Sequence, residues 1–103
     1  FASAPDGIAV TRGPLLVQIN PAGAQMLGFD HPSQLVGTSL TELMLPEEVP
    51  MMMRRMQAVT SGTPQPSQVY RVRRVDGSII SAEVSSIPIE HEGRPALLAF
   101  VRD

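Results

Sequence analysis

The last third of the chain alternates apolar and polar residues, which predicts three consecutive antiparallel strands over residues 67–102. Asp76-Gly77 and Glu92-Gly93 divide this stretch, because such pairs adopt the left-handed backbone of tight hairpin turns. Successive strand residues point to opposite faces of a sheet, so each parity marks one face. The parity that we expect to face inward consists of Gln68, Tyr70, Val72, Ile80, Ala82, Val84, Ser86, Leu97, Ala99 and Val101. The other parity mixes apolar and charged residues and is too apolar for a face that meets only water.

Shorter elements precede these strands. Alternation predicts a hairpin with strands at 8–11 and 15–19. Asn20 before a proline, with Gly28 further on, predicts a short helix, since Asn caps a helix start and Gly favours its end. A second short helix is expected at 32–36, ended by Gly37. Ser39 followed by Glu42 has the pattern of a capping box and predicts a third.

The longest helix is expected to begin after Pro50 and to end at Ser61. Its apolar stripe is Val49, Met52, Met53, Met56 and Val59, and the polar residues that lie off the stripe are Arg54, Arg55 and Gln57. Met51 lies outside the stripe and is a candidate for an external contact surface. The order of elements predicts a single α+β domain.

Composition narrows the classes of function. The chain has 103 residues, enough for one domain, and a net charge of −2. Its eight basic residues are all arginines and form no long run, so we expect no nucleic-acid partner and no direct membrane contact. The chain has no cysteine, which excludes disulfides, thiolate metal sites and cysteine nucleophiles. Phe1-Ala2-Ser3 has no signal-peptide pattern and is interpreted as the edge of a fragment of a longer protein.

The polar residues do not predict catalysis. His31 precedes a proline and His91 lies at a predicted hairpin tip, so both are expected to be solvated and neither has a nucleophile partner. Glu47 and Glu48 are consecutive helix residues whose side chains diverge by about 100°, which suits a helix start better than a catalytic dyad. Two separated histidines without cysteine predict no metal site. We therefore expect a domain that is not an enzyme.

Short landmarks along the whole chain resemble those of PAS sensor domains. They are Asp6-Gly7-Ile8, Asn20-Pro21-Ala22, Leu27-Gly28-Phe29, Leu35-Val36-Gly37, Pro46-Glu47, Tyr70-Arg71, Asp76-Gly77-Ser78, Gly93-Arg94-Pro95 and Val101-Arg102-Asp103. No single landmark is specific, but their joint order and spacing are. The resemblance implies a five-stranded antiparallel sheet, in which the N-terminal strands complete the C-terminal ones, with short helices and one longer helix on one face around a small pocket.

The resemblance also implies a role. Such domains are cytoplasmic input modules of bacterial signalling proteins, most often histidine kinases or diguanylate cyclases. Asp103 matches the first residue of the family's Asp-Ile-Thr exit motif, which leads to a C-terminal effector domain. Leu45 and Glu48 depart from the His and Asp that many relatives carry there, so any role of those polar groups is expected to be lost or softened.

The implied pocket is expected to be apolar. Its candidate walls are Met26, Leu27, Met53, Met56, Tyr70, Ile80, Val84 and Leu97, and its candidate hydrogen-bonding groups are Gln68, Tyr70 and Ser86. Such walls suit a small, mostly apolar ligand with one polar handle. Methionines also fill irregular gaps, so a completely closed core is the alternative. Gln68 is the main polar candidate because it lies on the inward parity, but its side chain could equally bond its own loop backbone.

Two cofactors known from relatives are not expected. Flavin photosensors of this fold carry a reactive cysteine, which this chain lacks. Oxygen-sensing relatives hold haem through a histidine on the longest helix; the corresponding place falls near Met53, and this helix has no histidine. Methionine can ligate haem iron, usually opposite a histidine, but a core role for Met53 is the stronger expectation. The alternative to a ligand sensor is a ligand-free homodimerisation module. Its candidate outer sheet face is Ile79, Ile87, Leu98 and Phe100.

Overall fold

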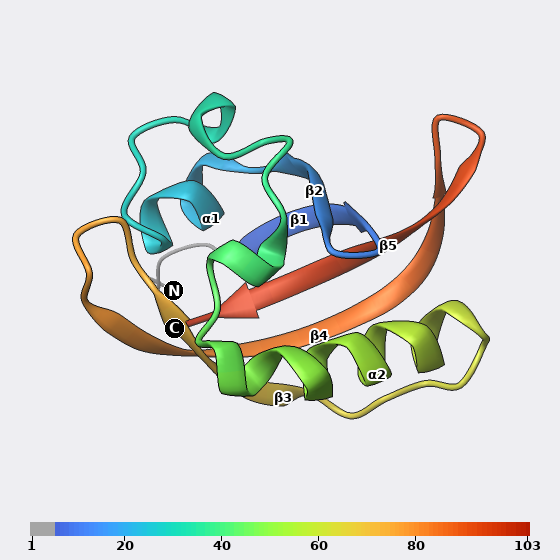
Figure 1. Ribbon diagram of the computed structural model, residues 1–103. Coiled ribbons are helices and arrows are strands. Elements are labelled where there is room, and N and C mark those ends of the chain that lie inside the picture. Colours follow the sequence, from blue (N-terminus) through green and yellow to red (C-terminus); the bar gives the residue numbers. More distant parts are fainter. Residues whose placement is uncertain (1–5) are drawn as a thin grey trace, which may run out of the picture.

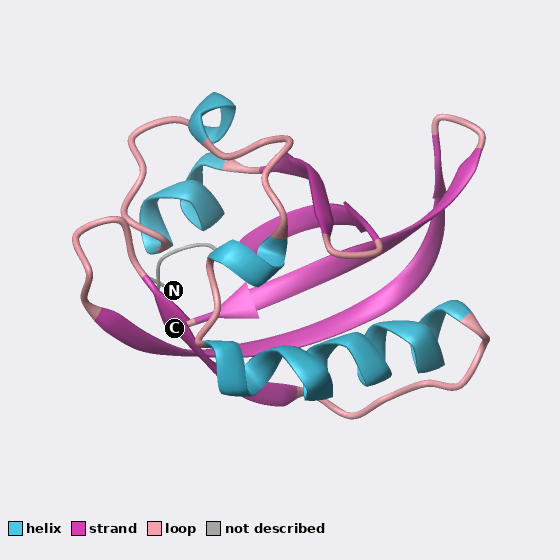
Figure 2. Cartoon of the chain, viewed as in Figure 1, coloured by secondary structure: helices cyan, strands magenta, loops and turns pink. Residues whose placement is uncertain are grey.

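The computed structural model describes residues 6–103, so the interpretation of Phe1-Ala2-Ser3 lies outside the described residues (Figures 1 and 2). The elements in chain order are β1 (Gly7–Arg12), β2 (Leu15–Ile19), α1 (Pro21–Met26), η1 (Pro32–Gln34), η2 (Leu40–Glu42), η3 (Pro46–Glu48), α2 (Val49–Thr60), β3 (Gln68–Arg73), β4 (Ile79–His91) and β5 (Arg94–Arg102), where η marks a single 3-10 turn. Within the described residues, no helix combines the length and the apolar character that crossing a bilayer requires.

The strands form one antiparallel sheet in the order β2-β1-β5-β4-β3. The last strand, β5, lies in the centre and pairs with both β1 and β4. Figure 1 shows the helices on one face of this sheet, with α2 crossing in front of β3 and β4. The predicted α+β fold, with five antiparallel strands and helices on one face, is confirmed.

Burial follows the predicted parity on β3. On β3, Tyr70 and Val72 are buried, whereas Val69, Arg71 and Arg73 are exposed. The core lies between the sheet and the helical layer and consists of Ala9, Leu16, Ile19, Ala24, Leu35, Leu43, Met44, Met52, Tyr70, Val72 and Ala82. These residues come from both halves of the chain, so neither half encloses the core alone.

Asn20 joins the first hairpin to α1. Its Oδ1 accepts hydrogen bonds from the N–H groups of Gly23 at 2.8 Å and Ile8 at 2.9 Å. Gly28 has a φ of 89° just after α1, and a Cβ there would lie 2.9 Å from a side-chain carbon of Val75. Only glycine combines that backbone conformation with so close an approach. The predicted roles of Asn20 and Gly28 are confirmed.

The other positions that the sequence marked as important for the fold are also found where it indicates them. Asp76 Oδ1 accepts from the N–H of Ser78 at 2.9 Å, with Gly77 between them at a φ of 89°. Gly37 has a φ of 90° after η1. Asp103 is exposed and follows the end of β5. The expected short helices at 32–36 and 39–42 are single 3-10 turns.

The prediction for α2 was wrong in its start and in its rotation. Pro50 lies in the first turn, where its missing N–H needs no partner, so the helix begins at Val49. Met53 is 38% exposed, whereas Met51 is partly buried against the core. Met53 lies about 100° around the axis from the buried Met52. The helix is rotated so that the flank carrying Met51 faces inward. Met51 therefore packs against the core and Met53 lies on the surface, which is the reverse of the prediction.

His91 is not the solvated residue that its place near a turn predicted. Its side chain is 22% exposed, and its Nδ1 and Nε2 lie 3.2 Å from Arg12 Nη2 and 3.2 Å from Gln18 Oε1. Arg12 Nη2 also donates to the His91 carbonyl oxygen at 2.8 Å. These bonds tie the tip of the β4–β5 hairpin to β1 and β2.

The edge strands β2 and β3 are hydrogen-bonded to connecting segments. On β3, the N–H of Arg71 donates to Glu48 Oε1 at 2.9 Å, and the N–H of Arg73 donates to the Leu43 carbonyl at 2.8 Å. On β2, the N–H and C=O of Leu16 bond to Thr38 and Gly37. The connecting segments therefore supply part of the pairing that a further strand would supply.

Candidate ligand-binding cavity

A cavity of about 130 Å³ lies between the inner face of the sheet and the helical layer. Its walls are mostly apolar. Residues 26–59 contribute Met26, Leu27, Leu40, Leu43, Met44, Met52, Met56 and Val59, and the sheet contributes Tyr70, Val72, Ala82, Val84, Leu97, Ala99 and Val101. A cavity of about 150 Å³ with such walls holds benzene, so this one accommodates a molecule of similar size.

Thr11 of β1 is one of the residues that line this cavity. The residue is 2% exposed, and its Oγ1 has no hydrogen-bond partner among the described residues. A buried hydroxyl without a partner costs about 1–3 kcal/mol. A ligand with one polar group would remove that cost. The sequence held a signal for Thr11. It lies two residues after Ala9 on the same strand, so both side chains point to the same face of the sheet, and Ala9 is buried.

Arg55 and Gln65 form a polar part of the lining, and both are partly exposed. Arg55 Nη1 lies 3.5 Å from Gln65 Oε1, and its Nη2 donates to the Pro66 carbonyl. The prediction that Arg55 lies off the buried stripe was wrong. Met52, Arg55, Met56 and Val59 occupy positions i, i+3, i+4 and i+7, and the apolar stem of arginine can lie on such a face.

Tyr70 adds a phenol to the polar groups of the wall. Burial raises the pKa of the Tyr70 phenol, and the nearby guanidinium of Arg55 opposes that rise only in part. The phenol therefore keeps its proton at neutral pH and can both donate and accept a hydrogen bond.

The comparisons with known proteins agree with this fold. The sequence model of the PAS domain family matches residues 5–103. The chain is a PAS domain. PAS domains are regulatory sensory modules, so the family agrees with the regulatory role that the sequence indicated. No curated relative matches the chain.

Solved structures show the same fold. The PAS domain of an HTR-like protein from Haloarcula marismortui is 27% identical with a TM-score of 0.72, over 97% of this chain and 82% of that one. A PAS domain from Colwellia psychrerythraea is 21% identical with a TM-score of 0.81, over 95% and 85% of the two chains. A domain of a sensory box sensor histidine kinase/response regulator from Geobacter sulfurreducens is 18% identical with a TM-score of 0.77, over 95% and 82%.

The cavity of this PAS domain brings together most of the residues that the sequence singled out. Those that line it are Met26, Leu27, Met56, Tyr70, Val84, Ser86 and Leu97. Met53 faces solvent, so its assignment to the pocket wall was wrong. Ile80 is partly buried against the core but does not line the cavity.

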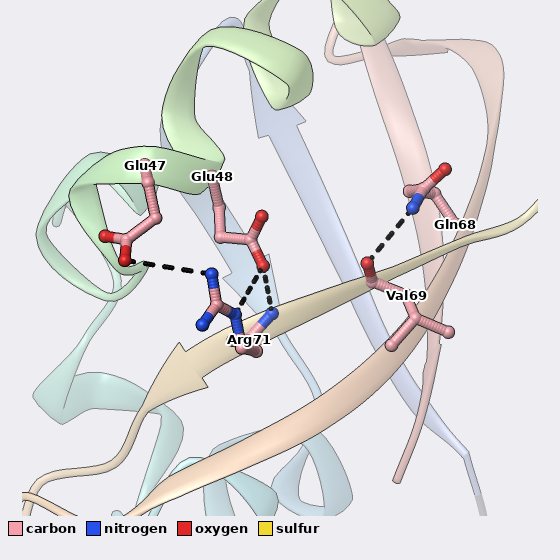
Figure 3. A network of polar contacts seen from close by, with 5 residues as sticks. All are labelled: Glu47, Glu48, Gln68, Val69 and Arg71. Atoms are coloured by element: carbon pink, nitrogen blue, oxygen red, sulfur yellow. Dashed lines mark hydrogen bonds and ion pairs between the residues drawn. The ribbon is translucent and has the colours of Figure 1, made fainter.

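Gln68 does not line the cavity either. Its Nε2 donates to the Val69 carbonyl at 3.2 Å, as Figure 3 shows. Gln68 begins the edge strand β3, whose outward carbonyls have no strand partner, so its long side chain bonds its own strand. The inward parity was correct for this strand, and of the two roles that the sequence left open for Gln68, the bond to its own backbone is the one observed.

Glu47 and Glu48 lie outside the cavity lining and bind Arg71 on β3 (Figure 3). Glu48 Oε1 accepts from the Arg71 backbone at 2.9 Å and from Nε at 3.2 Å, whereas Glu47 Oε2 lies 3.7 Å from Nη2. These bonds, the backbone bond most of all, lower the pKa of the Glu48 carboxyl. The pair therefore fastens the edge strand β3 to the segment before α2. Because Glu48 departs from the family pattern, we expected the role of a polar group there to be lost or softened, but Glu48 has a structural role of its own.

The outer face of the sheet carries the candidate dimer residues. Ile87 is 49% exposed and lies beside Leu98 in the strand register, and Phe100 lies beside Ile8. Ile79 is exposed at the opposite end of β4, about 27 Å away along the strand. Among the described residues, no group of three or more His, Asp or Glu side chains is arranged to hold a metal ion.

Proposed function

We propose that this PAS domain is a sensory input module that binds a small, mostly apolar ligand in the cavity. The observation that carries the proposal is the cavity of about 130 Å³, whose lining includes Thr11, a buried residue whose hydroxyl has no hydrogen-bond partner among residues 6–103. A purely structural core would be expected to close over such a space or to satisfy such a group. The methionines in the wall adapt readily to the shape of a ligand.

The proposed route of the signal runs through β5. Ala99 and Val101 of this central strand line the cavity, and Leu98 and Phe100 alternate with them on the outer face. A ligand changes the balance between two conformations only if it binds one of them more tightly. Movement of β5 would reach both the outer face and the C-terminal end, to which we assign the connection to an effector domain.

We further propose that the domain works in the cytoplasm as part of a longer bacterial signalling protein. A histidine kinase is the first candidate, and a diguanylate cyclase is the second. The sensor histidine kinase to which the Geobacter domain belongs supports this by analogy of fold.

Native mass spectrometry of gently purified protein tests ligand binding. We expect an added mass with the natural ligand or with a member of a panel of small metabolites. Ala99→Leu fills part of the cavity and should abolish the adduct, whereas Ser85→Val, at an exposed position of β4, should not. A bare chain mass across the whole panel would contradict the proposal.

A ligand-free dimerisation module is the second candidate function. The exposed Ile87 lies beside Leu98, and Phe100 and the exposed Ile8 form a second pair on β5 and β1, which favours pairing with a second copy through the outer face. Sedimentation should then show a dimer that Ile87→Glu separates. Val75→Glu is the matched control, because Val75 is 62% exposed in the β3–β4 loop. A monomeric wild type, or a dimer that Ile87→Glu leaves intact, would exclude this function.

A further inference from the structure

We propose that the ligand is a small carboxylate with an apolar body of about six carbon atoms, and that Arg55 binds its carboxylate group. The proposal rests on the ligand-binding function above and names the chemical class of the ligand. A body of this size matches the volume of about 130 Å³.

Arg55 carries a positive charge that no carboxylate within residues 6–103 neutralises. The ion pairs in the described residues involve Arg71, Arg102 and His91, and none involves Arg55. Residues 1–5 contain no Asp or Glu. A partly buried charge is unfavourable unless it is paired, and an anionic ligand would supply the missing partner.

Arg55 also has donors to offer. A guanidinium carries five N–H donors, and the bonds to Gln65 and Pro66 use one each from Nη1 and Nη2. Both of those acceptors are neutral. The remaining N–H groups can take a carboxylate, which a guanidinium binds strongly through two parallel hydrogen bonds.

The position of Arg55 provides separate surroundings for the carboxylate and for the apolar body of such a ligand. Met52, Met56 and Val59 lie on the same side of α2 and form an apolar wall next to it. Arg55 is itself partly exposed, so a carboxylate bound there keeps part of its hydration, which limits the cost of burying its charge. The apolar body would lie against the methionines.

A purely structural role for Arg55 is the competing explanation. Its bonds to Gln65 and Pro66 fasten the loop between α2 and β3, and they would do so without any ligand. This role predicts no preference between an anionic ligand and a neutral one of the same shape. The preference is therefore the property to measure.

Calorimetric titration near neutral pH with hexanoate and with hexanamide, its neutral isostere, measures this preference. We expect the wild type to bind hexanoate roughly tenfold to a hundredfold more tightly, the difference that a charged hydrogen-bond partner makes. Arg55→Met should lose the preference, and Arg55→Lys should keep part of it. Arg54→Met is the matched control and should keep it, since Arg54 is exposed and does not line the cavity.

The outcomes separate this inference from the proposed function. Equal binding of the two compounds by the wild type would overturn the inference and leave the ligand-binding function standing. If the wild type binds neither compound, the inference is overturned. Native mass spectrometry with the metabolite panel then decides whether the ligand-binding function stands. Should Arg55→Met not fold, the wild-type comparison still decides, because equal affinities refute the carboxylate.

Discussion

Glu48 offers a sharp test of how the helical layer holds the edge of the sheet. Its Oε1 accepts two hydrogen bonds from Arg71, one of them from the backbone of β3, while its side chain is only 14% exposed. Hydrogen bonds to a charged group contribute about 1.5–3 kcal/mol where they are buried. Arg71 is itself half exposed, so we expect Glu48→Ala to cost about 1.5–2 kcal/mol.

Glu47→Ala is the matched control. Glu47 sits one residue earlier and faces the same guanidinium, but its Oε2 is 3.7 Å away and its side chain is 61% exposed. An exposed ion pair of this kind is worth about 0–1 kcal/mol. For a domain of this size 1 kcal/mol shifts the melting temperature by about 4–8 °C, so thermal unfolding followed by circular dichroism resolves the two variants.

The pH dependence gives the same test a second arm. The folded-state pKa of Glu48 is lowered, so its contribution is complete above the unfolded value of about 4.3 and is lost as the pH falls through the lower folded value. Wild type and Glu48→Ala should therefore converge in stability at strongly acidic pH. Equal losses from Glu47→Ala and Glu48→Ala at pH 7, or a gap that persists in acid, would refute this account.

Three further tests concern other parts of the structure. Thr11→Val should raise the melting temperature of the ligand-free protein, because it removes a buried hydroxyl without a partner, and should weaken ligand binding; a lower melting temperature would show that the hydroxyl is satisfied. Asn20→Ala should cost about 2 kcal/mol in urea unfolding, since it removes a helix cap and a bond to β1, whereas Ser39→Ala, which uncaps one 3-10 turn, should cost less than half as much. Met52→Ala should cost about 2–3 kcal/mol and Met53→Ala less than about 0.5 kcal/mol, and the reverse order would mean that the helix is rotated the other way.

The sequence predicted the order of elements well because local rules set it. Asn20, Gly28 and the Asp76-Gly77 turn act through bonds and backbone angles within a few residues, and strand parity follows from the pleat itself. The fold could therefore be read from short patterns in the right order.

The rotation of α2 could not be predicted in the same way. Residues 51, 52 and 53 are all methionine, so the apolar pattern does not select which flank faces inward. Arg55 was counted as polar although its stem can be buried. Packing against β4 and β5 decides the rotation, and that information lies outside the helix.

The contacts of His91 and Gln68 show a second limit. The partners of His91 lie 79 and 73 residues away along the chain, so its neighbourhood in sequence indicates only a turn. Gln68 bonds the backbone next to it, a choice that depends on β3 being an edge strand. Both outcomes follow from strand order, which periodicity alone does not supply.

The hydrogen bonds along the edge strands also bear on how the domain behaves when it is crowded with copies of itself. A strand from another molecule that approached β3 would have to displace the Glu48 carboxylate from Arg71 and the Leu43 carbonyl from Arg73 before it could pair there. Along β2 it would meet Gly37 and Thr38 already bonded to Leu16. Edge-to-edge growth of sheets is a common route to amyloid-like aggregation, and these contacts protect the folded domain against it.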